Sequence, residues 1–242
     1  MRRRLQPSAR GLGPPDSYVA EGLVHMWDGA QGGGDTWTDT IAGLPLNIEG
    51  SRYSWGDGFI RVNGADSPYT YLYTPYFSGS GFDGHTIQVV ARWHRTAADQ
   101  WGRFLCLRSG TNDPCEILID KTATSGIGRL RFEYFDGNKI ADADVLNADM
   151  TKPFTATSVL NHSTSSWYGY FNNVKSSVVD GVNYAGPYPS NLVVGSNELG
   201  YTNCGVDADF FSVRIYNRAL SEDEIMRNNR VDAARFGIGG VA

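Results

Sequence analysis

Apolar and polar residues alternate with a period of two along most of the chain from about residue 22 onward. This pattern is typical of strands that bury one face and expose the other. The clearest apolar positions are Ile87, Val89, Ala91 and Trp93 in one segment and Leu130, Phe132 and Tyr134 in another. The strands predicted in this way include residues 59–63, 85–93, 104–107, 116–119, 130–134, 154–160, 167–171, 192–194 and 211–215. Many short strands with turn residues between them predict an all-β chain folded as a two-sheet antiparallel β-sandwich.

The end of the chain predicts one short helix. The last predicted strand is expected to place three apolar residues on one face: Phe211, Val213 and Ile215. After a turn at residues 217–220, Ser221 stands three residues before Glu224, which is the spacing of a helix-capping box. A helix is therefore expected from Glu222 to Arg235, and the glycines that follow are expected to end it.

This order of strand, turn and capped helix resembles the C-terminal signature of the laminin-G-like jelly-roll domains. The opening of the chain is similar to that family as well: a strand ends at Asp28, a Gly-rich loop follows at residues 32–34, and Trp37-Thr-Asp39 comes next. The family's usual Ser-Gly-Asn-Gly is replaced here by residues 40–44. The resemblance covers residues 22–229 and implies a concanavalin A-like jelly roll with a short C-terminal helix, used as a carbohydrate-recognition scaffold.

The first twenty residues differ from the rest and divide the chain in two. Residues 1–20 are rich in arginine, proline and glycine without periodicity, so we predict an N-terminal arm, followed by one jelly-roll domain over residues 21–242. Arg2, Arg3 and Arg4 are the predicted assembly anchor. The arginines are followed by no apolar segment of the signal-peptide kind, and no run of about eighteen apolar residues occurs. We therefore expect a soluble chain that has no membrane partner and is not exported by the ordinary secretory route.

Charge separates the two segments further. The chain of 242 residues has a net charge of −5. The first ten residues hold four arginines and no acid, so the rest of the chain is clearly acidic. An acidic body argues against nucleic acid as the main partner, because phosphate binding needs a basic face.

Aromatic residues, 12% of the chain, provide the predicted sugar-binding surface. Sugar rings stack on flat aromatic side chains, and alternating tyrosines in a strand share one sheet face. The predicted carbohydrate-binding residues are Tyr69, Tyr71 and Tyr73 in one run and Trp167, Tyr168 and Tyr170 in another. The alternative interpretation is that these side chains pack in the core of the sandwich.

The family resemblance also implies a structural calcium ion, although no cofactor is expected to be required. Calcium takes six to eight oxygen ligands. By position, the candidate ligands are Asp28, Asp207 and Asp209. The alternative is that these carboxylates cap turns.

Catalysis is the least favoured interpretation. The glucanases of the superfamily that the chain resembles use a Glu-x-Asp-x-Glu run, and this chain has none. Its nearest approaches are Asp142-Ala-Asp144 and Asp207-Ala-Asp209. Retaining glycosidases need two suitably spaced carboxyl groups. We therefore expect a non-enzymatic chain, with a glycoside hydrolase as the third alternative.

These observations together predict a non-catalytic carbohydrate-binding or structural module. The ending at residues 228–237 resembles the tails of laminin-G-like proteins found in phages and prophages of gut bacteria. This resemblance implies a virion protein, of the tail, a fibre or the capsid surface, that binds host surface glycans. Its partners would be a glycan or host surface polysaccharide and other virion proteins, the latter through the arm, and a homo-oligomer is expected. The alternative is a bacterial lectin or adhesin at the cell surface.

Overall fold

The computed structural model describes residues 17–65, 69–79, 82–96, 102–109, 112–119, 127–135, 140–182, 191–196 and 204–239. The predicted anchor residues Arg2, Arg3 and Arg4 lie outside these ranges, as does most of the predicted arm.

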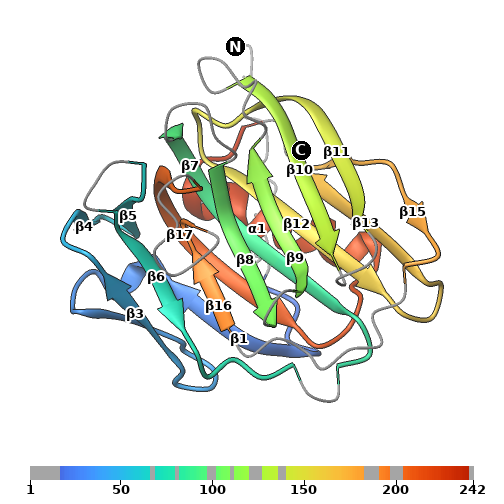
Figure 1. Ribbon diagram of the computed structural model, residues 1–242, viewed down its shortest axis with the longest axis horizontal. Coiled ribbons are helices and arrows are strands. Elements are labelled where there is room, and N and C mark those ends of the chain that lie inside the picture. Colours follow the sequence, from blue (N-terminus) through green and yellow to red (C-terminus); the bar gives the residue numbers. More distant parts are fainter. Residues whose placement is uncertain are drawn as a thin grey trace, which may run out of the picture.

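Two antiparallel sheets stack face to face as a β-sandwich jelly roll, which confirms the predicted fold class (Figure 1). Sheet A consists, in spatial order, of β14 (Val174–Lys175), β13 (Ser166–Phe171), β12 (Phe154–Asn161), β7 (His85–Thr96), β17 (Val206–Tyr216), β5 (Phe59–Asn63) and β4 (Tyr53–Gly56). Two further strands, β1 (Leu23–Asp28) and β15 (Val179–Asp180), pair with β17 and β13 respectively. Sheet B consists of β11 (Ile140–Asp149), β10 (Ile127–Phe135), β9 (Asn112–Ile119), β8 (Gly102–Ser109), β16 (Asn191–Val194), β6 (Tyr71–Thr74), β3 (Pro45–Glu49) and β2 (Thr36–Thr38). A one-turn 3-10 helix, η1 (Gly29–Gln31), and the helix α1 (Glu222–Phe236) complete the described elements.

The core lies between the sheets, where the alternation of the sequence places it. The apolar positions predicted in residues 85–93 and in residues 130–134 all lie in one large core cluster. The predicted inward faces of these two strands are therefore confirmed. Three fully buried tryptophans, Trp27, Trp37 and Trp167, lie in the same cluster. Fully burying each large apolar side chain is worth about 1.5–3 kcal/mol, so this layer is the main source of stability.

The predicted face of the last strand is wrong at one position. Val213 and Ile215 point into the core, but Phe211 packs on the opposite face of sheet A, and Phe210 takes the inward position. The cause is a β-bulge: Phe210 pairs with Ala91 of β7, whereas Ser212 pairs with the next residue of β7. The extra residue in β17 reverses the inward and outward faces on its two sides.

Helix α1 begins and ends as the sequence predicts. Ser221 accepts a hydrogen bond from the backbone N–H of Glu224, the Glu224 side chain accepts one from the backbone of Ser221, and Gly237 ends the helix in a left-handed conformation. The helix packs on the outer face of sheet A, the face turned away from sheet B. Ile225 contributes to an apolar cluster there, and Asp232 forms a fully buried ion pair with Arg214 of β17.

The described end of the predicted arm, residues 17–20, packs on the body. The Tyr18 hydroxyl donates a hydrogen bond to Asp232 at 2.8 Å, and its ring lies 4.1 Å from the Arg214 guanidinium. Val19 is buried, and its backbone N–H donates to Asn228 of α1. These contacts place residues 17–20 with the domain rather than with a free arm.

Candidate functional site

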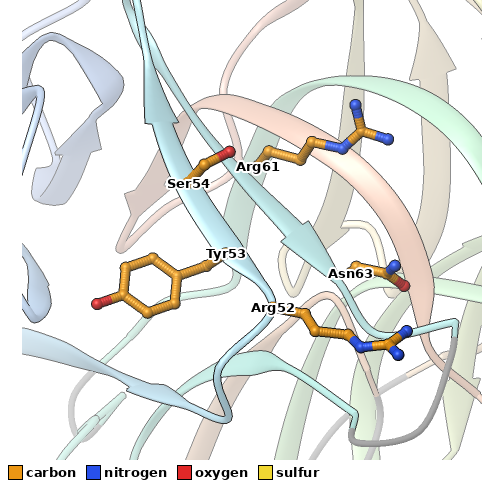
Figure 2. Close-up of a pocket in the computed structure, with 5 residues that line it drawn as sticks. All are labelled: Arg52, Tyr53, Ser54, Arg61 and Asn63. Carbon is orange, nitrogen blue, oxygen red and sulfur yellow. The ribbon is translucent and has the colours of Figure 1, made fainter.

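A shallow depression lies on the outer face of sheet A, over the hairpin of β4 and β5. Its volume is about 290 Å³, and its lining residues, drawn in Figure 2, are Arg52, Tyr53, Ser54, Arg61 and Asn63. Ile60 and Val62 of β5 point into the core, so the residues that alternate with them point outward to the depression.

Four of the lining side chains form a compact square, which we call the arginine array: Arg52, Ser54, Arg61 and Asn63. Ser54 lies directly opposite Arg61 in the β4–β5 pairing, and the Asn63 backbone N–H donates to the Arg52 carbonyl at 3.0 Å. In paired strands, directly opposite residues have Cβ atoms about 4.5–5.5 Å apart, and diagonal neighbours, as Arg52 and Arg61 are, lie about 7–8 Å apart. Figure 2 shows the Tyr53 ring pointing away from the other four side chains.

Two buried aspartates of β17 hold arginines in place beside the depression. Asp207 accepts two hydrogen bonds from Arg61, from Nε and Nη2, each 3.1 Å long. Asp209 binds Arg92 of β7 at 2.9 Å, and His94 Nε2 lies 3.1 Å from the same carboxylate oxygen. The hydrogen bonds that Arg61 donates to Asp207 raise the pKa of Arg61, which stays charged.

The pairing of β5 with β17 depends on two glycines. A Cβ atom on Gly205 would lie 1.9 Å from the carbonyl oxygen of Gly64, so a side chain at that position would force the strands apart. The Gly64 backbone N–H donates to the Val206 carbonyl at 2.8 Å. This close approach places Asp207 directly opposite Asn63.

An aromatic depression adjoins the same face. Its volume is about 400 Å³, and it lies between the end of α1 and the β4–β5 turn, lined by Asp57, Gly58, Phe211, Arg235 and Phe236. The Phe211 ring lies 5.3 Å from the Phe236 ring and 5.5 Å from that of Phe59. Phe59 and Arg61 are two residues apart on β5, so their side chains lie next to each other on the same face of the strand. An aromatic ring and a guanidinium group are therefore neighbours on this face.

The outer face of sheet A therefore presents guanidinium, amide and hydroxyl groups beside partly buried aromatic rings. Arginine offers five N–H donors, asparagine offers both a donor and an acceptor, and serine offers one of each. Such a set can bind hydroxyl groups, and its guanidinium groups can bind anions.

The structure separates the six aromatic residues predicted to bind carbohydrate. Trp167 is fully buried between the sheets, where its ring lies 5.6 Å from that of Tyr134 and its Nε1–H donates to the Phe132 carbonyl at 3.4 Å. Tyr170 is buried on the outer face of sheet A in the apolar cluster that includes Ile225 of α1. The prediction is corrected for these two residues, because the opposite sheet covers one and the α1 cluster covers the other.

The other four aromatics are partly accessible, but on different sheets. Tyr71 and Tyr73 lie on the outer face of sheet B, because Leu72 between them is in the core, and Tyr69 precedes them. Tyr168 lies on the outer face of sheet A, where the Lys175 Nζ atom is 4.5 Å from its ring centre. A binding role for these four tyrosines stays a prediction.

The three predicted calcium ligands are each bound by an arginine. Asp28 accepts a hydrogen bond from Arg235 at 2.7 Å and another from the backbone N–H of Ala30, so it caps a turn as the alternative interpretation proposed. Asp207 binds Arg61, and Asp209 binds Arg92. Within the described ranges, no group of three His, Cys, Asp or Glu residues is arranged to hold a metal ion.

The acidic pair of β11 is also paired with arginines. Asp142 lies 3.1 Å from Arg131, and Asp144 lies 3.2 Å from Arg129 and 3.1 Å from Arg131. Burial raises the pKa of Asp142, and the nearby arginine charges oppose that rise.

The arginine array was not predicted from the sequence, although the chain contains a signal for it. Arg52-Tyr-Ser54 and Arg61-Val-Asn63 flank Asp57-Gly58, a dipeptide typical of a hairpin turn. Period-two alternation on both sides of that turn would have placed the polar side chains on one face. The contribution of Asp207 and Asp209 had no comparable local signal.

The comparisons with known proteins show the fold. No protein-family model matches the chain, and no curated protein matches it in sequence. Among solved structures, Trypanosoma rangeli sialidase in complex with 2,3-difluorosialic acid has a TM-score of 0.70 at 13% identity, over 96% of this chain and 36% of the sialidase chain. The binding domain of botulinum neurotoxin DC, in complex with rat synaptotagmin II, has a TM-score of 0.66 at 11% identity, over 86% of this chain and 52% of its own.

A third similar structure concerns botulinum neurotoxin type C, whose cell entry depends on interaction with two ganglioside molecules. Its TM-score is 0.65 at 11% identity, over 86% of this chain and 51% of the toxin chain. This chain thus spans about a third to a half of the chains it matches.

The one α-helix of the described residues lacks the length and apolar character needed to cross a membrane.

Proposed function

We propose that this chain is a non-catalytic carbohydrate-binding module and that the β4–β5 depression is its binding site. The observation that carries the proposal is the arginine array, which gathers donors and acceptors in an open depression of about 290 Å³ on a hairpin of two paired strands. Polar groups fixed on strands are held more precisely than groups on loops, which favours selective binding.

Two further observations support this function. The fold is shared with a sialidase solved with a sialic acid derivative and with a toxin that interacts with gangliosides. In addition, the carboxylates considered for catalysis, Asp142, Asp144, Asp207 and Asp209, each contact an arginine. Such pairing suits groups that position other side chains rather than groups that exchange protons.

A glycan array probed with the purified chain tests the proposal. We expect saturable binding to a restricted class of glycans and at least a tenfold loss in the variant Ser54→Tyr, because the larger side chain fills the depression. The matched control is Ser177→Tyr, since Ser177 is also exposed but lies between β14 and β15, at the far edge of sheet A. An array without any bound glycan would contradict the function, and equal binding by Ser54→Tyr and the wild type would contradict the site.

We further propose that the module is carried on a phage virion and binds host surface glycans, with a bacterial cell-surface lectin or adhesin as the alternative. The C-terminal resemblance to phage and prophage proteins and the arginines of the arm support this location. In this proposal Arg2, Arg3 and Arg4 bind acidic groups of a neighbouring virion protein or of a second copy of the chain.

Deleting residues 1–16 should then abolish self-association or incorporation into particles while leaving the thermal midpoint unchanged. The deletion spares Tyr18 and Val19, whose contacts with α1 belong to the folded body. Light scattering gives the oligomeric state, and differential scanning calorimetry gives the midpoint. If the shortened chain assembles as well as the full chain, the arm is not an anchor.

A further inference from the structure

We propose that the β4–β5 depression binds an anionic sugar, one that bears a carboxylate or sulfate group, and that Arg52 and Arg61 receive the anion. This inference rests on the proposed carbohydrate-binding function and adds the chemical class of the ligand. It follows from how charge is layered at this face, since the acids lie beneath the surface and the guanidinium groups lie above them.

The exposed fractions of the paired side chains show this layering. The side chain of Asp207 is 7% exposed and that of its partner Arg61 is 43% exposed. The side chain of Asp209 is 1% exposed and that of its partner Arg92 is 37% exposed. Arg52 is exposed as well. In both pairs the guanidinium group is therefore far more accessible to a ligand from solvent than the carboxylate that binds it.

The buried aspartates also fix the direction in which the arginines present their donors. The bonds from Arg61 to Asp207 use Nε and Nη2, so Nη1 lies on the side of the guanidinium away from Asp207. Arg92 also donates from Nε and Nη2, in this case to a single oxygen of Asp209. A guanidinium group that is already oriented loses less side-chain entropy when it binds an anion, which favours affinity.

The spacing within the arginine array fits one sugar unit. Arg52 and Arg61 are diagonal neighbours, which in paired strands lie about 7–8 Å apart, and Ser54 and Asn63 occupy the other two corners. An anionic substituent can lie between the two guanidinium groups while ring hydroxyls reach the serine hydroxyl and the asparagine amide. A neutral sugar offers these guanidinium groups only hydroxyl acceptors, whereas an anion offers a charged acceptor and a stronger hydrogen bond.

The test is a binding comparison in which each acidic glycan is printed beside its neutral counterpart. One arm pairs uronic and nonulosonic acid glycans with their methyl esters, and a second arm pairs sulfated glycans with desulfated ones. We expect the acidic member of a pair to bind at least tenfold more tightly, and the arm in which this occurs identifies the group. Binding that is equal for both members would overturn the inference while leaving carbohydrate binding intact. Binding of no glycan at all would overturn both.

Charge variants locate the anion. Ser54→Glu places a carboxylate between Arg52 and Arg61, so we expect the affinity for acidic glycans to fall tenfold or more. Ser54→Gln introduces a side chain of the same shape without the charge, and we expect it to lower that affinity much less. Arg52→Gln should weaken the binding of acidic glycans by about 10–100-fold, the range for a lost hydrogen bond to a charged group.

The control for Arg52→Gln is Arg129→Gln on sheet B, which removes the same charge far from the depression. In this control Asp144, the partner of Arg129, still has an ion pair with Arg131. Calorimetry first establishes that each variant is folded. The inference is overturned if Ser54→Glu and Ser54→Gln lose the same affinity for acidic glycans, or if Arg52→Gln loses none.

Discussion

Replacing Arg214 with methionine is expected to lower the free energy of unfolding by about 3–5 kcal/mol. Arg214 and Asp232 are both 0% exposed, and they join the central strand β17 to helix α1. Removing the arginine leaves the carboxylate of Asp232 buried without its counter-charge. That uncompensated charge, more than the lost attraction, is the source of the large effect.

The neighbours of the pair show why it tolerates burial. Arg214 Nη1 donates to Asp232 at 2.8 Å and Arg214 Nε donates to Gln88 at 3.3 Å, while Thr155 and Tyr18 donate to the two oxygens of Asp232. Burial alone would lower the pKa of Arg214, but the charge and hydrogen bonds of Asp232, together with the nearby Tyr18 and Tyr216, raise that pKa overall. The network therefore compensates both charges.

Urea unfolding measures this effect, and two further variants interpret it. Lys152→Met removes an exposed ion-pair partner and should change the unfolding free energy by less than about 1 kcal/mol. The double variant Arg214→Met with Asp232→Leu should recover much of the loss, because no lone charge remains buried. A double variant as unstable as Arg214→Met would show that packing of α1, rather than the lone charge, causes the loss.

Replacing Trp167 with alanine is expected to lower the free energy of unfolding by about 3–5 kcal/mol, the usual cost of truncating a large buried aromatic. The side chain is 0% exposed and packs against His85 and Tyr134, so its removal leaves a cavity between the sheets. This result would separate the core position seen in the structure from the sugar-binding role predicted from the sequence.

The control for this variant is Tyr76→Ala. Tyr76 is 73% exposed, and its truncation should change the unfolding free energy by no more than about 0.5 kcal/mol. Chemical unfolding gives the stability of both variants, and the glycan array gives their binding. A Trp167→Ala chain that kept its stability but lost glycan binding would contradict the placement of Trp167 in the core.

The sequence by itself determined the elements that depend on neighbouring residues. The alternation in residues 85–93 predicted the inward face of β7, because successive side chains of a strand point to opposite sides. The spacing of Ser221 and Glu224 predicted the start of α1, because a capping box is made within one turn. The two-sheet fold followed from the repetition of such strands along the chain.

Where apolar residues stand on both faces of a strand, only the tertiary structure decided which residues are buried between the sheets and which are covered from outside. Phe210 and Phe211 are both apolar, and the bulge against β7 decided which one enters the core. Trp167 and Tyr170 lie on opposite faces of β13, as alternation requires, yet both are buried, because sheet B covers one face and the α1 cluster covers the other.

The candidate site shows the same division between local and distant information. Arg61 and Asn63 face outward together because they alternate with core residues in β5. Their partner Asp207 is 146 residues away from Arg61 in the sequence and meets it only because β17 pairs with β5. Local spacing fixes the direction of a side chain, but the charge it meets depends on which strands become neighbours in the folded sheet.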